Sequence, residues 1–228
     1  MLVWLTSAMS SLLQLEVRPA AADHRSWVCV EIGERIIAAL LVALLSPVFL
    51  IVWVLTLALS GRTALIAHQR VGQGGSKLWV FKFRTMWNGP KKWILRPFWL
   101  ERIDDEDGPD LKGPNDRRVG SRFARFCRHH SLDELPQLVQ VVLGQMSLVG
   151  PRPVTVSELD RIYGPEVEEI IQCRPGISGL WQVSGRSRLS LAQRCRLDLE
   201  LVRGRSVRLY FSLVLRTLRE VLVGDGAW

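Results

Sequence analysis

The sequence predicts a mainly helical α+β protein with one membrane helix near its N-terminus. Three observations support this fold class: residues 36–60 carry no charged side chain, arginine stripes recur at helical spacing further along, and a glycine-rich turn lies between two short extended runs. The 228 residues suffice for one sizeable core rather than two full domains. We therefore expect a leader of unclear role at 1–30, a membrane helix at 31–61 and one folded domain at 62–228.

The composition favours an anionic partner. The chain has 30 Lys and Arg against 22 Asp and Glu, a net charge of +8, which suits a phosphorylated substrate, an acidic membrane surface or nucleic acid. Hydrophobic residues make up 48% of the chain and are concentrated before residue 61, which favours the membrane over nucleic acid. The four cysteines are far apart and lack metal-ligand spacing, so we expect reduced thiols.

The apolar segment predicts a bent helix. Residues 36–60 are long enough, at about 1.5 Å per residue, to cross a hydrocarbon core of about 30 Å. Ser46-Pro47 lies near the middle, where proline removes one backbone hydrogen bond and clashes with the preceding turn. An ordinary kinked spanning helix and a helix that enters and leaves by the same face both fit. Basic residues after the helix, such as Arg62 and Arg70, place the body of the protein in the cytoplasm.

Residues 69–86 predict a small β-hairpin around the turn at 72–75. Lys82 and Arg84 share a strand face and can reach an anion, although a solvated strand face is an equal alternative. The next residues, 87–99, interleave Trp and Phe with Lys and Arg. This pattern is typical of a lipid headgroup boundary, and also of a loop that completes a core.

A basic helix is predicted just before two adjacent acids. Its stripe is formed by Arg118, Arg122, Arg125 and His129, and Gly120-Ser121 is a possible start. A solvated surface helix is the alternative to an anion-binding one. A second basic amphipathic helix is predicted near the C-terminus, with Arg205, Arg208, Arg216 and Arg219 on one stripe, which suits either a membrane surface or the surface of the domain.

The acids Asp133 and Glu134 follow this helix. Ser131-x-x-Glu134 matches a capping box, but Pro136 would strain a helix begun at Ser131, so either the start is bent or the regular helix begins near Pro136. In both cases the acids lie near a helix N-terminus, where free N–H groups favour phosphate. One carboxylate can attack phosphorus while the other holds a magnesium ion.

Several motifs together resemble the bacterial sugar transferase family, the monotopic phosphoglycosyl transferases. They cover residues 35–228 in the family's order. These motifs are Ser46 to Phe49, Gln69 to Gly72, Phe81 to Met86, Ser131 to Gln137, Met146 to Pro153, Arg174 to Arg186 and Gly224 to Trp228. The chain departs from the family's pattern at Glu34-Arg35, where a Lys-Arg pair is usual, and at Gln140 and Gln145, where Asn and Asp are usual.

The resemblance implies roles for individual residues. Asp133 would attack the β-phosphorus of a UDP-sugar, form a phosphosugar-aspartyl intermediate and release UMP, and a polyprenyl phosphate such as undecaprenyl phosphate would then attack that intermediate. Glu134 would bind Mg²⁺, while Arg128 and Arg152 would bind phosphate. The break at Ser46-Pro47 would make the membrane helix re-entrant, with both ends cytoplasmic.

The remaining candidates for phosphate binding are Lys82, Arg84 and Arg186, the last at the end of a glycine-rich stretch that also suits a plain structural loop. We therefore expect a catalytic domain on the cytoplasmic face of the bacterial inner membrane, with amphipathic helices at the interface. It would transfer hexose 1-phosphate in exopolysaccharide or other surface glycan synthesis and bind no nucleic acid, and a homo-oligomer is compatible with the sequence. The alternatives are a membrane-bound hydrolase of nucleotide or lipid diphosphates, and a membrane-anchored basic scaffold that binds acidic lipid or nucleic acid.

Overall fold

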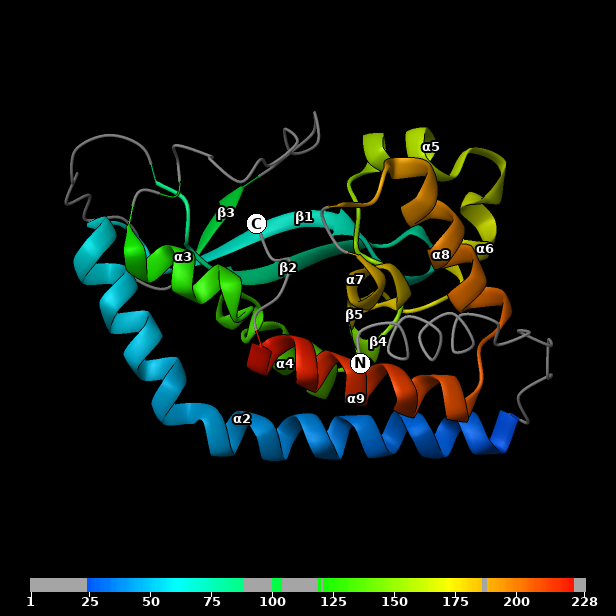
Figure 1. Cartoon of the computed structure of the whole chain (residues 1–228), viewed down its shortest axis with the longest axis horizontal. Coiled ribbons are helices and arrows are strands. Elements are labelled where there is room, and N and C mark those ends of the chain that lie inside the picture. Colours follow the sequence, from blue (N-terminus) through cyan, green and yellow to red (C-terminus); the bar gives the residue numbers. More distant parts are fainter. Residues whose placement is uncertain (1–23, 88–99, 104–118, 120, 186–187, 224–228) are drawn as a thin grey trace, which may run out of the picture.

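The computed structural model describes residues 24–87, 100–103, 119, 121–185 and 188–223. It is mostly helical with two small sheets, as expected from the sequence (Figure 1). The α-helices are α2 (His24–Ser60), α3 (Arg122–His129), α4 (Gln137–Val142), α5 (Val156–Tyr163), α6 (Val167–Ile171), α7 (Leu180–Ser184), α8 (Leu191–Arg203) and α9 (Val207–Val223). The strands are β1 (Leu65–Val71), β2 (Lys77–Phe83), β3 (Glu101–Ile103), β4 (Ser147–Val149) and β5 (Gly176–Ser178), and the short 3-10 helices are η1 (Gln73–Gly75), η2 (Leu132–Glu134) and η3 (Gly164–Glu166).

The predicted hairpin is confirmed. Strands β1 and β2 pair in antiparallel fashion, with Leu65 opposite Phe83 and Val71 opposite Lys77. The turn between them needs glycine, because Gly74 has a φ of 67°, in the left-handed region. Strand β3 adds to the other edge of β1 in parallel, and β4 and β5 form a separate parallel pair.

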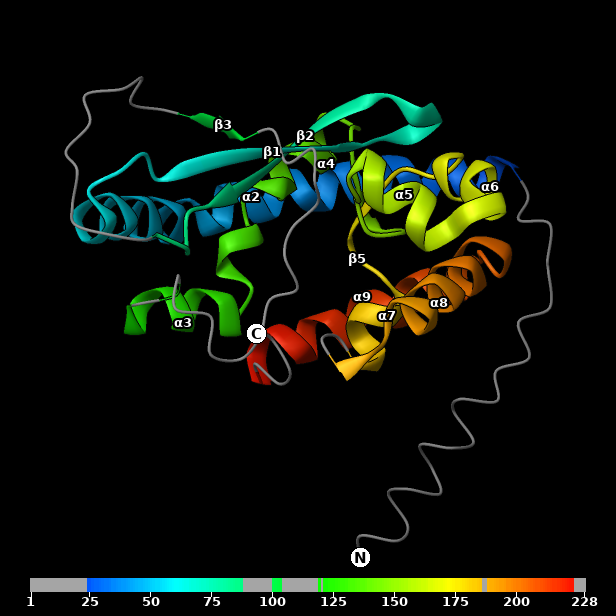
Figure 2. The same cartoon turned by 90° about the horizontal axis from the view of Figure 1, so that it is seen from above.

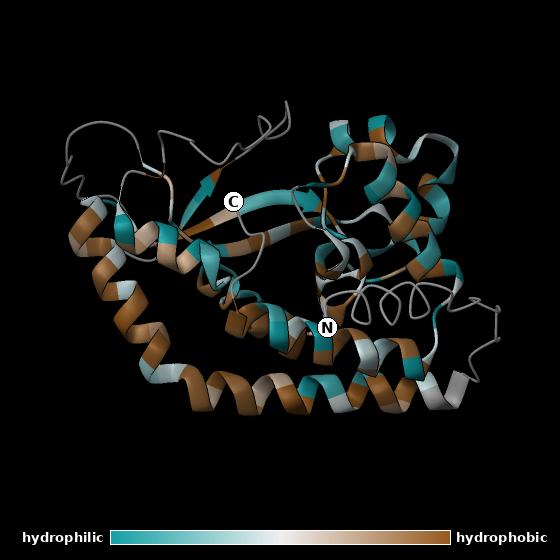
Figure 3. Cartoon of the chain, viewed as in Figure 1, coloured by the Kyte–Doolittle hydropathy of each residue, from teal (hydrophilic) through white to brown (hydrophobic). Residues whose placement is uncertain are grey.

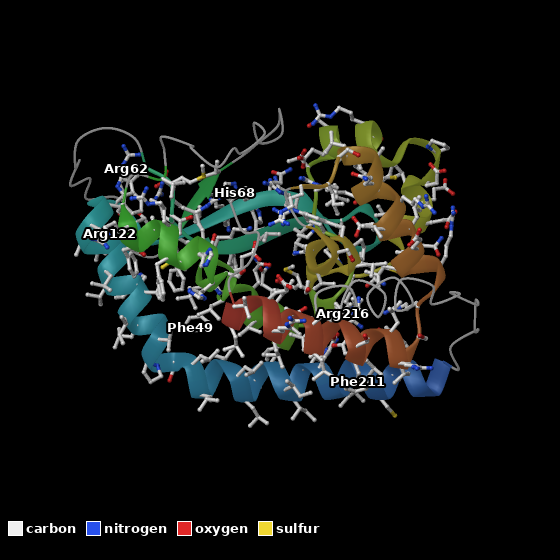
Figure 4. The ribbon with its side chains drawn as sticks, viewed as in Figure 1. Phe49, Arg62, His68, Arg122, Phe211 and Arg216 are labelled. Carbon is white, nitrogen blue, oxygen red and sulfur yellow. The ribbon has the colours of Figure 1, made fainter. Side chains whose placement is uncertain are left out.

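Helix α2 bends part-way along its length, as Figure 1 shows, and Phe49, labelled in Figure 4, lies close to the bend. Pro47 lies inside the helix and has no N–H to donate to the carbonyl of Ala43, four residues earlier. The hydroxyl of Ser46 donates to that carbonyl instead, at 2.8 Å. Serine before proline therefore satisfies the acceptor that the proline leaves unpaired.

Among the described residues, Trp27–Ser60 is the only helix long and apolar enough to cross a membrane. Little of it is buried, and its outer side is strongly apolar in Figure 3. The large exposed side chains on α2 include Ile32, Ile36, Leu40, Leu44, Leu50, Ile51 and Val54. Exposed apolar side chains continue onto α9, at Phe211, Leu215, Leu218 and Leu222. Phe211 and Arg216 lie on different sides of α9 (Figure 4), as the predicted amphipathic pattern requires.

The inner side of α2 belongs to the core of the domain. Ala38 is fully buried against Val80 of β2 and against Leu138 and Val141 of α4. Further along, Val52 packs with Phe83 and Cys127. Helix α2 therefore packs against the rest of the domain along its inner side, and it is not a separate membrane anchor.

A buried carboxylate fixes the first half of α2 to the domain. Glu34 is only 3% exposed. Its Oε2 accepts hydrogen bonds from the hydroxyl of Tyr210 (2.7 Å), the hydroxyl of Ser147 (2.7 Å) and the backbone N–H of Leu148 (3.2 Å). Arg174 pairs with Oε1 of Glu34 at 3.6 Å and also with Glu31. One side chain of α2 therefore links β4, α9 and the loop before β5.

Candidate active site

A cleft of about 850 Å³, including its open mouth, lies between the hairpin, the segment η2–α4 and the helices α5, α7 and α8. Its charged lining residues are Arg70, Lys82, Glu134, Arg152, Glu158, Arg194 and Asp198, and His68, labelled in Figure 4, adds an imidazole.

Two acids lie on an irregular turn beside the cleft, and Glu134 is the one that lines it. Ser131 has a φ of 55° and is the only non-glycine residue with positive φ among the described residues. It makes no side-chain capping bond, so the capping box expected from Ser131 and Glu134 is wrong. The regular helix α4 begins after Pro136, which agrees with the second alternative drawn from the sequence. A residue with left-handed backbone two positions before Asp133 is what functional sites often contain.

Lys82 and Glu134 meet at the cleft. Nζ of Lys82 lies 2.6 Å from Oε1 of Glu134, and both side chains are about one fifth exposed. Lys82 is on β2 and Glu134 is on η2, so the pair joins segments 52 residues apart. The structure thus brings these two predicted site residues together.

Asp133 has different surroundings from its neighbour. Burial, followed by the charge of Glu134, raises the pKa of Asp133 to about 6, while Lys82 and Arg128 oppose the rise. The carboxylate is therefore largely ionised at neutral pH, yet more basic than an ordinary aspartate. Behind it, burial and the charge of Asp133 raise the pKa of Cys127 to about 12, so that thiol stays neutral.

Arg128, on helix α3, stabilises the ionised form of Asp133. Its charge lowers the pKa of Asp133, which indicates proximity. The helix begins where the sequence suggested, because the side chain of Ser121 accepts a hydrogen bond from the N–H of Ala124. Arg122 of the same predicted stripe is not among the residues that line the cleft. Arg118 lies outside the described residues.

Arg152 lies on the opposite wall of the cleft. Its guanidinium is 5.5 Å from the centre of the Trp181 ring, and the guanidinium of Arg194 is 4.8 Å from the same centre. Burial, followed by the charge of Arg152, lowers the pKa of Arg194. Asp198 is 1% exposed and accepts a hydrogen bond from the hydroxyl of Tyr163 at 2.8 Å, and burial raises its pKa to about 7.

One predicted phosphate-binding residue, Arg84, is described by the structure and is not brought to the cleft. Arg84 is buried, donates to Glu101 at 2.6 Å and to the carbonyl of Thr63 at 2.9 Å, and is absent from the lining. Burial lowers its pKa, although Glu101 opposes this. Arg186 lies outside the described residues.

Sequence patterns did not identify Arg194 and Asp198 as residues of the site. They are four residues apart on α8 and therefore on one helix face. A signal was present: Ser190 and Gln193 form a capping box that fixes the start of α8. The helical phase follows from that start, but only the tertiary fold shows that this face meets the cleft.

The described residues contain no group of three His, Cys, Asp or Glu side chains placed to hold a metal ion. Magnesium does not need such a group, since it is commonly bound through one or two carboxylates together with substrate phosphates and water. Glu134 lines the cleft and Asp133 is its neighbour, so the chain fits this substrate-bridged mode of binding.

Comparisons with known proteins agree with the geometry. The family model described as bacterial sugar transferase matches residues 26–224. The chain is 36% identical over 217 residues to a UDP-galactose-lipid carrier transferase of Erwinia amylovora, covering 94% of this chain and 44% of that protein. It is 35% identical over 193 residues to the exopolysaccharide production protein ExoY of Rhizobium meliloti, covering 84% of each. It is 34% identical over 227 residues to a UDP-glucose:undecaprenyl-phosphate glucose-1-phosphate transferase of Caulobacter vibrioides, covering 94% of this chain and 78% of that protein.

Proposed function

The chain belongs to the bacterial sugar transferase family, and we propose that it transfers hexose 1-phosphate from a UDP-sugar to undecaprenyl phosphate with release of UMP. Relatives named for UDP-sugars, undecaprenyl phosphate and exopolysaccharide production support both substrates and a role in surface glycan synthesis. The chain spans less than half of the Erwinia relative, so the proposal concerns the step that this matched part performs.

One observation carries the proposal: an ionisable Asp133 adjoins the Glu134–Lys82 pair at a cleft whose other wall holds Arg152. A buried carboxylate with a raised pKa is a better nucleophile than an ordinary one, provided that it is ionised. Cations on both walls suit the charges of a diphosphate.

The proposed reaction has two displacements at one phosphorus atom. In the first, an oxygen of Asp133 bonds to the β-phosphorus and the bond from that phosphorus to the bridging oxygen breaks, so UMP leaves with the electron pair. In the second, an oxygen of the lipid phosphate bonds to the same phosphorus and the bond to Asp133 breaks. The carboxylate is restored, and the product is a lipid-linked diphosphosugar.

The chain's own cations hold the charges that this reaction moves. Lys82 keeps the Glu134 carboxylate in one orientation at the cleft, and Arg128 keeps Asp133 ionised near neutral pH. Mg²⁺, held by Glu134 and the substrate phosphates, would supply charge neutralisation at the phosphate oxygens. Arg152 is placed to bind a phosphate from the other wall.

We propose further that α2 is re-entrant, with both ends at the cytoplasmic face of the bacterial inner membrane. The bend, the Ser46 hydrogen bond that stabilises it and the exposed apolar side chains of α2 and α9 support this arrangement. It would bring a lipid phosphate to the level of the cleft. Labelling of a cysteine introduced before Arg35 tests the topology, since access from outside the cell would contradict it.

The decisive test of the activity is product identity. Purified protein is incubated with a panel of UDP-sugars, Mg²⁺ and undecaprenyl phosphate, and the released nucleotide is identified. We expect UMP from wild type and none from Asp133→Asn, because the amide is not nucleophilic. Release of UDP would indicate an ordinary glycosyltransferase, and release of UMP without lipid would indicate a hydrolase.

The same variants test the scaffold alternative. A scaffold that binds acidic lipid would keep its function in Asp133→Asn. It would lose that function when Arg122 and Arg125, both exposed on α3, are neutralised. We expect the reverse pattern, with the arginine variants retaining UMP release.

A further inference from the structure

The guanidinium groups of Arg152 and Arg194 both lie near the ring of Trp181, on the wall of the cleft opposite Glu134. Their guanidinium carbons are 5.5 Å and 4.8 Å from the centre of the Trp181 ring, and Trp181 is only 6% exposed. Arginine stacks well on aromatic rings and keeps its donors in a rigid plane. The ring therefore fixes two sets of donors beside each other at the cleft.

Two like charges at close range cost free energy until an anion joins them. The charge of Arg152 contributes to the lowered pKa of Arg194, which confirms that the two cations interact. Two acids lie beside the same cluster and partly offset its charge: Glu158 opposes the fall in the pKa of Arg194, and Arg152 opposes the rise in the pKa of Asp198. Glu158 also accepts hydrogen bonds from the N–H and hydroxyl of Thr155, and Asp198 accepts one from Tyr163. An incoming phosphate would meet both guanidinium groups.

We propose that Arg194 and Arg152 together bind the α-phosphate of the nucleotide across the ring of Trp181 and stabilise UMP as it leaves. The inference rests on the proposed function and adds a substrate-binding residue, Arg194, that the sequence argument did not identify. When Asp133 displaces UMP, the bridging oxygen becomes a phosphate oxygen with additional negative charge. Donors fixed in place before the reaction then bind the leaving group more tightly than the intact donor.

The position of the cluster favours the nucleotide over the lipid phosphate. Helix α8, which carries Arg194, lies at the end of the molecule opposite the bent arm of α2 in both Figure 1 and Figure 2. A lipid phosphate must arrive with its apolar chain alongside exposed apolar surface, and that surface lies on α2 and α9. The cluster of Trp181 on α7, Arg194 on α8 and Arg152 after β4 carries two cations. It therefore suits a phosphate that has no lipid chain attached.

The test compares binding of UMP and of uridine to the full chain in detergent, by calorimetry. We expect Arg194→Gln to weaken UMP binding roughly ten-fold and to leave uridine binding unchanged, since only the phosphate contact is lost. Arg196→Gln is the matched control on the same helix, because Arg196 is 82% exposed and pairs with Glu200 at 3.0 Å. It should bind UMP like wild type. Equal UMP affinity in Arg194→Gln and Arg196→Gln overturns the proposal.

A second variant and a second ligand complete the experiment. Arg194→Lys keeps the charge but loses the planar donors, so we expect an intermediate loss of UMP affinity, and thermal unfolding checks that each variant is folded. Farnesyl phosphate serves as a soluble lipid phosphate. If Arg194→Gln weakens farnesyl phosphate and spares UMP, the site belongs to the acceptor and our assignment is wrong. Because binding requires no turnover, tight UMP binding by wild type without sugar transfer would refute the proposed function and leave this site intact.

Discussion

Asp133 and Glu134 are neighbours in the sequence, yet the fold gives each carboxylate its own chemistry. Glu134 is held by Lys82 at 2.6 Å at the cleft, which keeps its charge in place. Asp133 is half-buried, and desolvation together with the charge of Glu134 raises its pKa to about 6, which leaves it reactive near neutral pH.

The pKa of Asp133 predicts the pH dependence of the reaction. The nucleophile must be ionised, so the rate of UMP release should be level above pH 7 and fall about ten-fold per pH unit below about 6. Initial rates between pH 5 and 8, at fixed Mg²⁺ and saturating substrates, measure this. A level profile down to pH 5 would contradict Asp133 as the nucleophile with the surroundings described.

Asp133→Asn is also informative about stability. The folded state holds a proton on Asp133 more tightly than the unfolded chain does, so this group stabilises the fold at low pH, and that stability is lost as the pH rises through about 6. At pH 7.5 the ionised carboxylate therefore costs free energy that an amide does not. We expect Asp133→Asn to be inactive and to unfold at the same temperature as wild type or a few degrees higher.

The same residues show how far local sequence predicts a site. Lys82 and Arg84 have the spacing of one strand face, but β2 ends at Phe83, so the alternation no longer applies to Arg84. Its partner, Glu101, comes from a strand 17 residues later. Lys82 lines the cleft, whereas the environment of Arg84 depends on a contact that no local pattern contains.

At the scale of elements, the cleft depends on the packing of α4 against β2, and one amide side chain connects them. Gln140 is fully buried. Its Oε1 accepts from the N–H of Phe81 at 2.9 Å, and its Nε2 donates to the carbonyl of Trp79 at 2.8 Å. The side chain thus replaces a neighbouring strand for this stretch of β2 and fixes Lys82 beside η2.

Gln140→Leu should lower the free energy of unfolding by about 2–5 kcal/mol, because it leaves a buried N–H and a buried carbonyl unpaired at about 1–3 kcal/mol each. Thermal unfolding in detergent measures the loss. The control is Gln145→Leu, since Gln145 is exposed and the hydrogen bond between its side chain and that of Gln140 is 3.4 Å long. Equal unfolding temperatures for the two variants would contradict this role of Gln140.

Elements with strong local signals were predicted well. The absence of charge predicted α2, glycine predicted the hairpin turn and Ser121 predicted the start of α3. The turn at Ser131 was not predicted, because its left-handed backbone is imposed by the segments packed on both sides and not by a residue that favours it. The boundary at Pro136 was predicted only as one of two alternatives.

At the scale of the whole molecule, α2 and the domain form one packed unit. The carboxylate of Glu34 accepts hydrogen bonds from Tyr210, Ser147 and Leu148 and faces Arg174, so four distant segments meet at one buried group. No sequence pattern revealed this, since Glu34 had been considered only for its position before the apolar segment. Its role depends on residues more than 110 positions away.

Glu34→Leu should be strongly destabilising, by about 3–5 kcal/mol, because it removes the acceptor of three hydrogen bonds and one of the two carboxylates that pair with Arg174. The unfolding temperature in detergent measures this. Glu31→Leu is the control, since Glu31 is 30% exposed and contacts the same arginine. A similar loss for both variants would show that the arginine pairing, and not the buried hydrogen bonds of Glu34, holds the two parts together.

The core shared by α2 and α4 has a practical consequence for preparing this protein. Removing residues 24–60 to obtain a water-soluble fragment would expose the apolar side chains of Val80, Leu138 and Val141. It would also remove the Glu34 carboxylate that Tyr210 and Arg174 contact. Such a fragment should aggregate during expression rather than refold. Replacement of α2 by an unrelated hydrophobic anchor should fail in the same way. Purification therefore calls for the intact chain in detergent or nanodiscs.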